Sequence, residues 1–212
     1  MTGPAIKICG ISTPETLAAV IAARADYVGF NFHAPSPRHV TLAQAQALGA
    51  QAQGQVRRVG LFVDAPDQAL GDAIATGALD ALQLHGEESP GHVAELRRFG
   101  LPVWKVISVA ARGDLDRAAG YLGAADFLLL DARTPAGSLP GGMGLKFDWS
   151  LLSGWKAPLP WGLAGGLNPA NVAQAMALTG APLVDAASGV ESAKGIKDPA
   201  LIAQFCAAVR GL

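Results

Sequence analysis

The sequence predicts an α/β protein of the (β/α)8 class, a TIM barrel, in which eight parallel strands form a closed ring inside a layer of helices. Runs with strand character begin eight times, at intervals of roughly 20 to 35 residues. A helical pattern follows each run, and strands joined through helices are parallel. The run 127–131 is almost entirely leucine, which is typical of a strand buried on both faces. The chain of 212 residues is shorter than the usual ~250 but lies within the range of this fold.

Each predicted strand is an apolar run that ends at a polar residue or at a turn residue. The eight strands are expected at 6–10, 26–32, 57–63, 81–85, 103–108, 127–131, 161–164 and 183–187.

The predicted helices begin at recognisable start signals. Thr13 followed by Pro14 indicates an N-cap with proline in the first turn, and Asn168 with Pro169 repeats this signal. Acidic residues before Pro90 suit the positive end of a helix dipole. The helices are expected at 15–24, 42–53, 67–77, 90–99, 115–122, 148–152, 170–178 and 198–209.

An open, doubly wound sheet is the alternative architecture. Such sheets that bind dinucleotides carry a G-x-G-x-x-G fingerprint after the first strand. The only G-x-G here, Gly142 to Gly144, follows the sixth strand. The barrel is therefore favoured.

The composition narrows the possible functions. Half of the residues are hydrophobic, enough to bury a large core, and no segment resembles a linker, so we expect one domain spanning residues 1–212. The formal net charge is -1 and there is no basic run, which argues against nucleic acid as a partner. A small-molecule ligand is the better expectation.

The chain also lacks the signals of export. No window is long and apolar enough to cross a membrane, and the first residues do not resemble a signal peptide. Cys9 and Cys206 are the only cysteines, and two thiols so far apart do not make a disulfide scaffold. We expect reduced thiols, no membrane association and a cytoplasmic protein, either a monomer or a homodimer.

Reactive groups in this fold lie at the carboxyl ends of the strands. Alternation along a strand places Gln83 with His85, and Leu129 with Asp131, on the face toward the barrel interior. The residues at or near the predicted strand ends are Cys9, Asn31, Asp64, His85, Ser108, Asp131, Gly165 and Ser188.

Cys9 and Asp131 are the candidate reactive groups. Lys7 shares a strand face with Cys9, and a nearby cation would lower the pKa of the thiol and supply thiolate. Apolar surroundings favour the protonated form of a carboxyl group, which suits Asp131 as a general acid. The alternatives are an inert buried thiol, which is favoured for Cys206, and a capping or ion-paired carboxylate. Together Cys9 and Asp131 would form a proton-transferring pair.

Glycine turns and one arginine suggest how an anionic ligand is held. Gly165–Gly166 and Ser188–Gly189 follow the seventh and eighth strands, where many barrels of this class bind phosphate on backbone N–H groups. Arg38, in a loop stiffened by two prolines, could bind a carboxylate through its planar fork. The alternatives are glycines that only make turns and a solvated surface arginine.

The four histidines form no metal-binding motif, so neither a metal ion nor a cofactor is expected. His85, at a strand end, is expected to touch the substrate. Lys7 and Lys105 are both expected to face the barrel interior, which keeps a Schiff-base lysine as an alternative.

Several of these segments together resemble the phosphoribosylanthranilate isomerase family. Their order and spacing match the family over nearly the whole chain, and Cys9 with Asp131 separates it from barrels that use other acids and bases. The matching segments are Lys7–Gly10, Ser36–Arg38, Gln83–Gly86, Leu130–Asp131, Phe147–Trp149, Ala164–Leu167 and Ser188–Glu191.

The resemblance implies an Amadori rearrangement in tryptophan biosynthesis, without a metal or cofactor. It converts N-(5-phosphoribosyl)anthranilate to 1-(2-carboxyphenylamino)-1-deoxyribulose 5-phosphate. Asp131 would be the general acid and Cys9 the general base, while Arg38 would bind the anthranilate carboxylate. Asp185 would contact the ribose hydroxyls. The phosphate would lie on the amides around Gly142, Gly144, Gly165, Gly166, Ser188 and Gly189.

The chain departs from the family pattern at two places. Met143 and Leu145 stand where the family usually has threonine and lysine, and the cation moves to Lys146, which affects the expected phosphate contacts. Asn31 stands where an aliphatic residue is usual. Family members occur alone or fused to neighbouring pathway enzymes, and we expect a free-standing enzyme here.

Three other functions stay open at this point. The first is an isomerase of histidine biosynthesis, or one that serves both pathways, although such enzymes are expected to pair two aspartates. The second is a Schiff-base lyase that uses Lys7 or Lys105. The third is a module that binds a phosphorylated ligand without catalysis.

Overall fold

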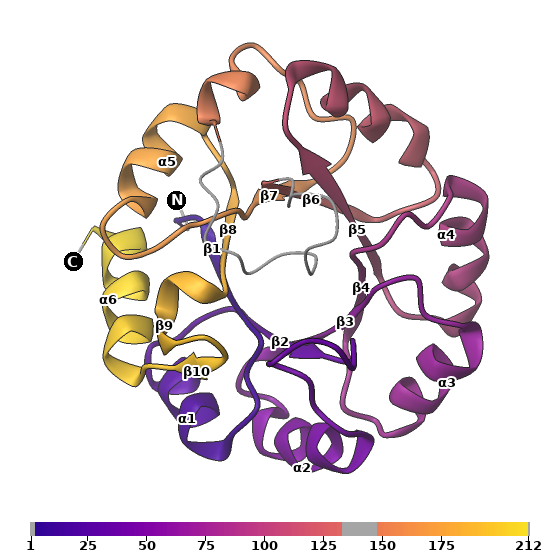
Figure 1. The fold of residues 1–212 in the computed structure, drawn as a ribbon, viewed down its shortest axis with the longest axis vertical. Coiled ribbons are helices and arrows are strands. Elements are labelled where there is room, and N and C mark those ends of the chain that lie inside the picture. The colour runs from indigo at the N-terminus through magenta and orange to yellow at the C-terminus, as the bar shows by residue number, and fades with distance from the viewer. Residues whose placement is uncertain (1–2, 133–147, 212) are drawn as a thin grey trace.

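The computed structural model describes residues 3–132 and 148–211. Its eight main strands are hydrogen-bonded in sequence order into a closed barrel, and all of their pairings are parallel (Figure 1). The predicted (β/α)8 barrel is therefore confirmed. The strands are β1 Ala5–Cys9, β2 Tyr27–Asn31, β3 Arg57–Phe62, β4 Ala81–Leu84, β5 Val103–Val109, β6 Phe127–Ala132, β7 Trp161–Leu163 and β8 Leu183–Ala186.

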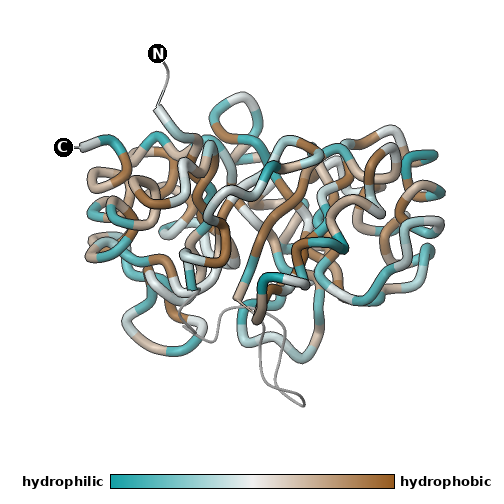
Figure 2. The backbone as a smooth tube through the Cα atoms, turned by 90° about the horizontal axis from the view of Figure 1, so that it is seen from above, coloured by the Kyte–Doolittle hydropathy of each residue, from teal (hydrophilic) through white to brown (hydrophobic). Residues whose placement is uncertain are grey.

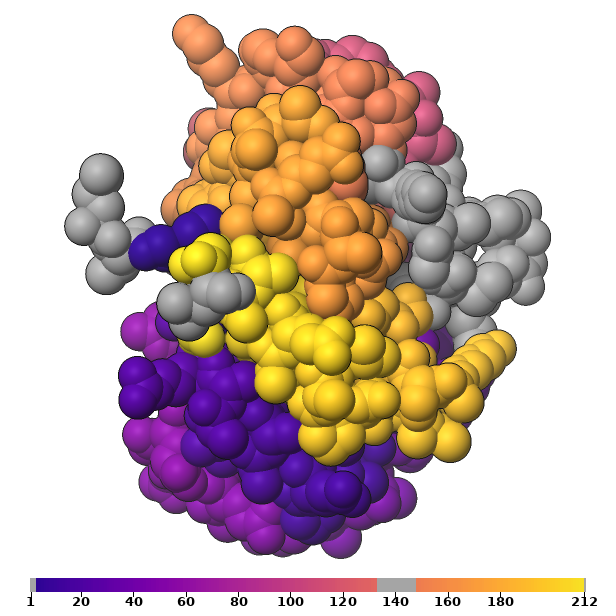
Figure 3. Space-filling model, turned by 90° about the vertical axis from the view of Figure 1, so that its left-hand side faces the viewer, coloured from indigo at the N-terminus to yellow at the C-terminus, as the bar shows by residue number. Residues whose placement is uncertain are grey.

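Helices surround this barrel, as Figure 1 shows. Figure 3 shows α6 in yellow between α5 in orange and α1 in indigo, so the last helix closes the ring against the first. The α-helices are α1 Pro14–Ala22, α2 Leu42–Ala52, α3 Asp67–Ala75, α4 Pro90–Leu96, α5 Val172–Thr179 and α6 Pro199–Arg210. The 3-10 helices are η1 Arg97–Phe99, η2 Arg112–Tyr121, η3 Trp149–Leu152 and η4 Ser188–Val190.

The helix start predicted at Thr13 and Pro14 is confirmed, but the one predicted at Asn168 and Pro169 was wrong, because residues 169–171 form a turn and α5 begins at Val172. The side chain of Thr13 accepts a hydrogen bond from the N–H of Thr16 at 3.3 Å, and Pro14 occupies the first turn of α1. Asp198 caps α6 in the same way, through the N–H groups of Ala200 and Leu201. These caps satisfy N–H groups that have no partner within the helix.

Several segments differ from the sequence-based expectation, among them the helix expected at 148–152, which is the 3-10 helix η3. The helix expected at 115–122 is the 3-10 helix η2, which contains Gly113 and Gly120, residues that weaken an α-helix. A two-stranded antiparallel hairpin, β9 Glu191–Ala193 and β10 Ile196–Lys197, follows η4 and was not expected. Such short strands lack the alternating pattern that identifies a strand in a sequence.

Apolar side chains form two cores. The larger lies between the strands and the helices, and Figure 2 shows apolar residues in brown along the strands and polar residues in teal mainly on the outer segments. The smaller core fills the inside of the barrel with Val59, Ala81, Trp104, Val106, Leu129, Ala164 and Leu183. Within the described ranges, no helix combines the length and apolarity needed to cross a membrane.

Candidate active site

The carboxyl ends of the strands surround a small polar cavity. Cys9 from β1 and Asp131 from β6 both line it, so the two candidate reactive groups lie on one site. Both side chains are buried, at 5% and 6% exposure. The other predicted residues that line the same cavity are Arg38, His85, Gly165, Gly166, Asp185 and Ser188.

A buried ion pair lies directly below Cys9. The Lys7 ammonium is 3.2 and 3.1 Å from the two carboxylate oxygens of Asp185, and Lys7 is fully buried. Burial works to lower the pKa of Lys7, but Asp185 and then Cys9 raise it more, so it lies above its usual value. The register of β1 and β8 sets this pair, because Lys7 lies opposite Asp185 in the ladder. Lys7 is therefore a fixed cation inside the barrel.

The pKa of Cys9 differs from the sequence-based expectation. Lys7 does share the inner face with Cys9, as alternation predicts, and it lowers the pKa of the thiol. Burial acts in the opposite direction and is the larger effect, so the pKa of Cys9 is raised rather than lowered. The expectation of a lowered pKa was wrong, because the sequence shows a neighbouring charge but not the loss of water around the sulfur.

His85 and Asp131 form the second polar contact of the cavity. The Nε2 atom of His85 is 3.3 Å from Oδ2 of Asp131. On the other side of the imidazole, Nδ1 is buried and has no hydrogen-bond partner among the described residues. The Oε1 atom of Gln83, two residues earlier on the same strand face, is also buried without one. Buried polar atoms without a partner are costly, which indicates a site that a polar ligand completes.

Arg38 is held by a partner that the sequence did not reveal. Its Nε and one terminal nitrogen donate to the two carboxylate oxygens of Glu191, at 2.6 and 2.9 Å. Lys197 also donates to Glu191, at 2.6 Å, and these charges lower the pKa of Glu191 to about 2 against the effect of burial. Arg38 is only 7% exposed, so the alternative of a solvated surface arginine was wrong.

Asn31, the second departure from the family pattern, fixes the loop of Arg38. Its Oδ1 accepts from the N–H of His33 at 2.8 Å, and its Nδ2 donates to Oγ of Ser36 at 3.2 Å. The same Ser36 oxygen accepts from the N–H of Arg38 at 3.1 Å. Asn31 therefore ties the end of β2 to the segment that carries the guanidinium group.

The glycine turns lie where the sequence placed them. Gly165 has φ +87°, and a side chain there would meet the backbone nitrogen of Ala132 at 2.6 Å. Gly189 does not line the cavity but packs behind it, since a side chain would lie 1.9 Å from the carbonyl oxygen of Leu167. Gly142 and Gly144 lie outside the described residues, as do Met143, Leu145 and Lys146.

Lys105 does not face the barrel interior, so this expectation was wrong. Its neighbours on β5, Trp104 and Val106, belong to the inner core, and alternation turns Lys105 toward the helices. There it donates to Glu88 at 2.8 Å and to the carbonyl oxygen of Gly86 at 2.7 Å. The sequence contained a signal for the outward direction of Lys105. Ser108 was expected at the inner end of β5, and alternation places residues 105 and 108 on opposite faces of a strand.

A comparison of the sequence with models of known protein families identifies one matching family. The model described as N-(5'phosphoribosyl)anthranilate (PRA) isomerase matches residues 6–208. The chain belongs to this family. The family resemblance that the sequence motifs indicated, and with it the expectation of an isomerase, is confirmed.

Individual members of the PRA isomerase family agree with this assignment. The N-(5'-phosphoribosyl)anthranilate isomerase of Paramagnetospirillum magneticum is 52% identical over 208 residues, which cover 97% of each chain. The crystal structure of phosphoribosyl anthranilate isomerase from Thermotoga maritima matches with a TM-score of 0.87 and 33% identity, covering 99% of this chain and 100% of that one. A second solved isomerase, in complex with reduced 1-(o-carboxyphenylamino)-1-deoxyribulose 5-phosphate, has a TM-score of 0.86 and 32% identity, with coverage of 99% and 100%.

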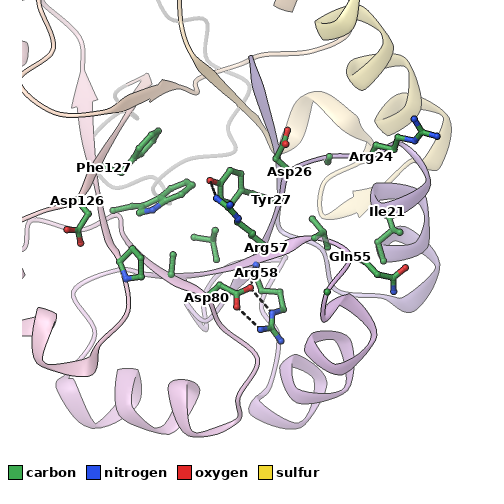
Figure 4. A pocket seen from close by; sticks show the side chains of 17 residues that line it. Ile21, Arg24, Asp26, Tyr27, Gln55, Arg57, Arg58, Asp80, Asp126 and Phe127 are labelled. Carbon is green, nitrogen blue, oxygen red and sulfur yellow. Dashed lines mark hydrogen bonds and ion pairs between the residues drawn. The ribbon is translucent and has the colours of Figure 1, made fainter. Parts of the chain in front are cut away.

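A larger cavity, of about 870 Å³, lies at the opposite end of this PRA isomerase family barrel (Figure 4). Two of its charged side chains, those of Arg58 and Asp80, pair with each other. Figure 4 shows Arg58 joined to Asp80, and the guanidinium group donates to both carboxylate oxygens at 2.8 and 2.7 Å. Size alone would favour this cavity, but it contains neither thiol nor histidine. In the described part of the chain, no three His, Cys, Asp or Glu side chains are grouped to hold a metal ion.

Proposed function

We propose that the chain catalyses the Amadori rearrangement of N-(5-phosphoribosyl)anthranilate to 1-(2-carboxyphenylamino)-1-deoxyribulose 5-phosphate in tryptophan biosynthesis. The main observation behind this proposal is that Cys9 and Asp131 line the same cavity. The reaction needs one base and one acid that act on the same sugar. Membership of the PRA isomerase family supports the choice of substrate.

Asp131 is proposed as the general acid. Its proton goes to the ring oxygen of the ribose as the bond from that oxygen to C1 breaks, and the nitrogen lone pair forms the iminium. His85, 3.3 Å from the carboxyl group, is suited to orient it. Asp131 is buried, so little water reaches this proton.

Cys9 is proposed as the general base. Its thiolate takes the proton from C2, the electron pair of that bond forms the double bond between C1 and C2, and the iminium electrons return to nitrogen. The resulting enolamine tautomerises to the ketone. No oxidant or reductant enters either step, which agrees with the expectation that no cofactor is needed.

The remaining polar groups are proposed to hold the two anionic ends of the substrate. The turns at Gly165–Gly166 and Ser188–Gly189 follow β7 and β8, where backbone N–H groups can bind phosphate, with Gly142 and Gly144 as further candidates. Arg38 is proposed to bind the anthranilate carboxylate, and Glu191 holds its guanidinium group in place. Asp185 is proposed to reach the ribose hydroxyls.

A Schiff-base mechanism is disfavoured at both lysines. Lys105 lies on the outer face of β5, away from the cavity. Lys7 lies inside, but Asp185 raises its pKa against the effect of burial, whereas a Schiff base needs a neutral amine. Borohydride treatment with substrate should therefore leave no adduct on the chain.

The decisive experiment follows the fluorescence of N-(5-phosphoribosyl)anthranilate with purified protein. We expect consumption of this substrate by the wild type, and none of the histidine-pathway aldose substrate. Cys9→Ala and Asp131→Asn should each abolish turnover, with Cys206→Ala and the exposed Asp116→Asn as matched controls that stay active. Appreciable activity of either site variant would refute the role given to that residue.

A further inference from the structure

The sulfur of Cys9 and the ammonium group of Lys7 share a space that a glycine leaves open. Gly29 on β2 lies opposite Cys9 in the ladder. A methyl group on Gly29 would lie 2.7 Å from Sγ of Cys9 and 3.2 Å from Nζ of Lys7. Because both atoms lie so close to this one position, Sγ and Nζ are at most about 6 Å apart, which is within the reach over which opposite charges stabilise each other. The absence of a side chain at Gly29 therefore allows the ammonium group of Lys7 to lie beside the sulfur of Cys9.

Asp185 fixes Lys7 in this position from the other side. Lys7 cannot reach water, and both oxygens of Asp185 accept from its ammonium group. An isolated lysine at this depth would lose its proton, because burial disfavours the charged form. The carboxylate therefore keeps the cation charged while the backbone of β1 aims it at Cys9.

Other charged groups also surround the sulfur, but none combines the charge and the position of Lys7. Lys7 is the strongest of the groups that lower the pKa of the thiol against burial, and Lys197 lowers it more weakly, whereas Asp185 raises it as burial does. Lys197 and Arg38 both donate to Glu191, which offsets their charge. The titratable groups that face Cys9 across the cavity and around it are Lys7, Arg38, His85, Asp131, Asp185, Glu191 and Lys197.

We propose that Lys7 is a positioning residue whose ammonium group holds the sulfur of Cys9 as an anion when it acts as a base, and that Asp185 keeps this ammonium group charged and in place. The proposal rests on the proposed function, because it assigns Lys7 to the base step of that reaction. In this step the proton from C2 goes to the sulfur, and Lys7 and Asp185 keep their own protonation states.

A thiol titration tests this role separately from catalysis. In a Cys206→Ala background Cys9 is the only thiol, so thiolate absorbance and the rate of alkylation by iodoacetamide both report on it. In Lys7→Met the midpoint of thiolate formation should rise by about one to three pH units. The kcat/KM at neutral pH should fall by roughly ten- to a thousand-fold and recover as the pH rises, with little change in KM.

Lys105→Met is the matched control. Lys105 is as deeply buried as Lys7 and also forms an ion pair, at 2.8 Å, but it lies on the outer face of the wall. Its substitution removes a buried lysine without changing the charge beside Cys9. We expect the thiol midpoint of this variant to equal that of the Cys206→Ala parent.

Two further variants keep the test decisive if Lys7→Met does not fold. Lys7→Gln retains a donor toward Asp185 without the charge and should raise the midpoint in the same direction. Asp185→Asn removes the carboxylate that keeps Lys7 charged, so the midpoint should also rise, by less than in the Lys7 variants because an anion that disfavours the thiolate is lost as well. An unchanged midpoint in a folded Lys7 variant, or equal shifts in the Lys7 and Lys105 variants, would overturn the proposal.

Failure of the proposal is distinguishable from failure of the proposed function. If the midpoint rises in the Lys7 variants while Cys9→Ala remains active, Lys7 controls the thiol but Cys9 is not the base. If Cys9→Ala is inactive while the midpoint does not move, Cys9 is the base and Lys7 does not set its charge.

Discussion

The two ends of the barrel both contain paired charges but differ in how completely their buried polar atoms are satisfied. At the carboxyl end, Gln83 and His85 each leave a buried polar atom without a partner among the described residues. At the amino end, Arg58 is saturated by Asp80 and two backbone carbonyl oxygens, those of Gly49 and Gly77. Unsatisfied polar groups cost stability and are kept where a ligand completes them, whereas saturated groups stabilise the fold.

Aromatic side chains strengthen this contrast. Trp104 is packed against Tyr27 at a centroid distance of 5.0 Å and against Phe127 at 4.5 Å, all at the amino end. Arg57 covers this group by donating to the hydroxyl of Tyr27 at 2.9 Å, as Figure 4 shows. We infer that the residues at the amino end mainly stabilise the fold and that those at the carboxyl end perform the reaction. This division is typical of the fold.

The largest expected effect is on catalysis at the carboxyl end. Asp131→Asn should lower kcat/KM to the background of the assay, by at least the roughly 10²- to 10⁴-fold that a general acid usually contributes. Its melting temperature should stay the same or rise, because a buried carboxyl group in an incomplete site is removed. Steady-state fluorescence assays and thermal unfolding measure the two effects. A large loss of stability would contradict the division between the ends.

Trp104→Ala should produce the opposite pattern at the amino end. The indole is 5% exposed and fills the inner core, so its loss should reduce the free energy of unfolding by about 3–5 kcal/mol. Activity per folded molecule should remain close to that of the wild type. Urea unfolding and an assay normalised to folded protein check both statements, and a selective loss of activity would show that the two ends are coupled.

Asp80→Asn should have a smaller effect of the same kind. It removes the negative charge that pairs with Arg58 and leaves one amide oxygen, beside the two backbone carbonyl groups, to accept from the guanidinium group. The Asp80 side chain is 39% exposed, so water partly replaces the pair and we expect a loss of only about 1 kcal/mol. Urea unfolding of Asp80→Asn beside Asp72→Asn, an exposed carboxylate on α3, measures the difference.

The last expected effect is confined to acidic pH and concerns stability at the carboxyl end. Burial would raise the pKa of Glu191, but Arg38 and Lys197 lower it from 4.5 to about 2. Because the folded-state pKa is depressed, this carboxylate stabilises the fold above about pH 4.5 and loses that effect as the pH falls toward 2. Glu191→Gln should flatten this part of the curve of stability against pH. An unchanged slope would show that Glu191 is not ionised under these conditions.

Much of the candidate site was predictable because it depends on local rules. Alternation along β1 put Lys7 and Cys9 on one face, and alternation along β4 did the same for Gln83 and His85. The barrel then brought the strand ends together at one cavity, which follows from the fold class alone. These rules hold because successive side chains of a strand point to opposite faces whatever surrounds the strand.

The sequence by itself determined the strand order, the inner faces of β1, β4 and β6, and the meeting of Cys9 with Asp131. The tertiary structure decided the partners and the charge states. Asp185 reaches Lys7 across 178 positions of sequence, and Glu191 reaches Arg38 across 153. Closing the barrel also removed water from Cys9, which raised its pKa despite the lysine beside it. The physical reason is that side-chain direction is a local property of the backbone, whereas desolvation and ion pairing depend on everything the fold brings around a group.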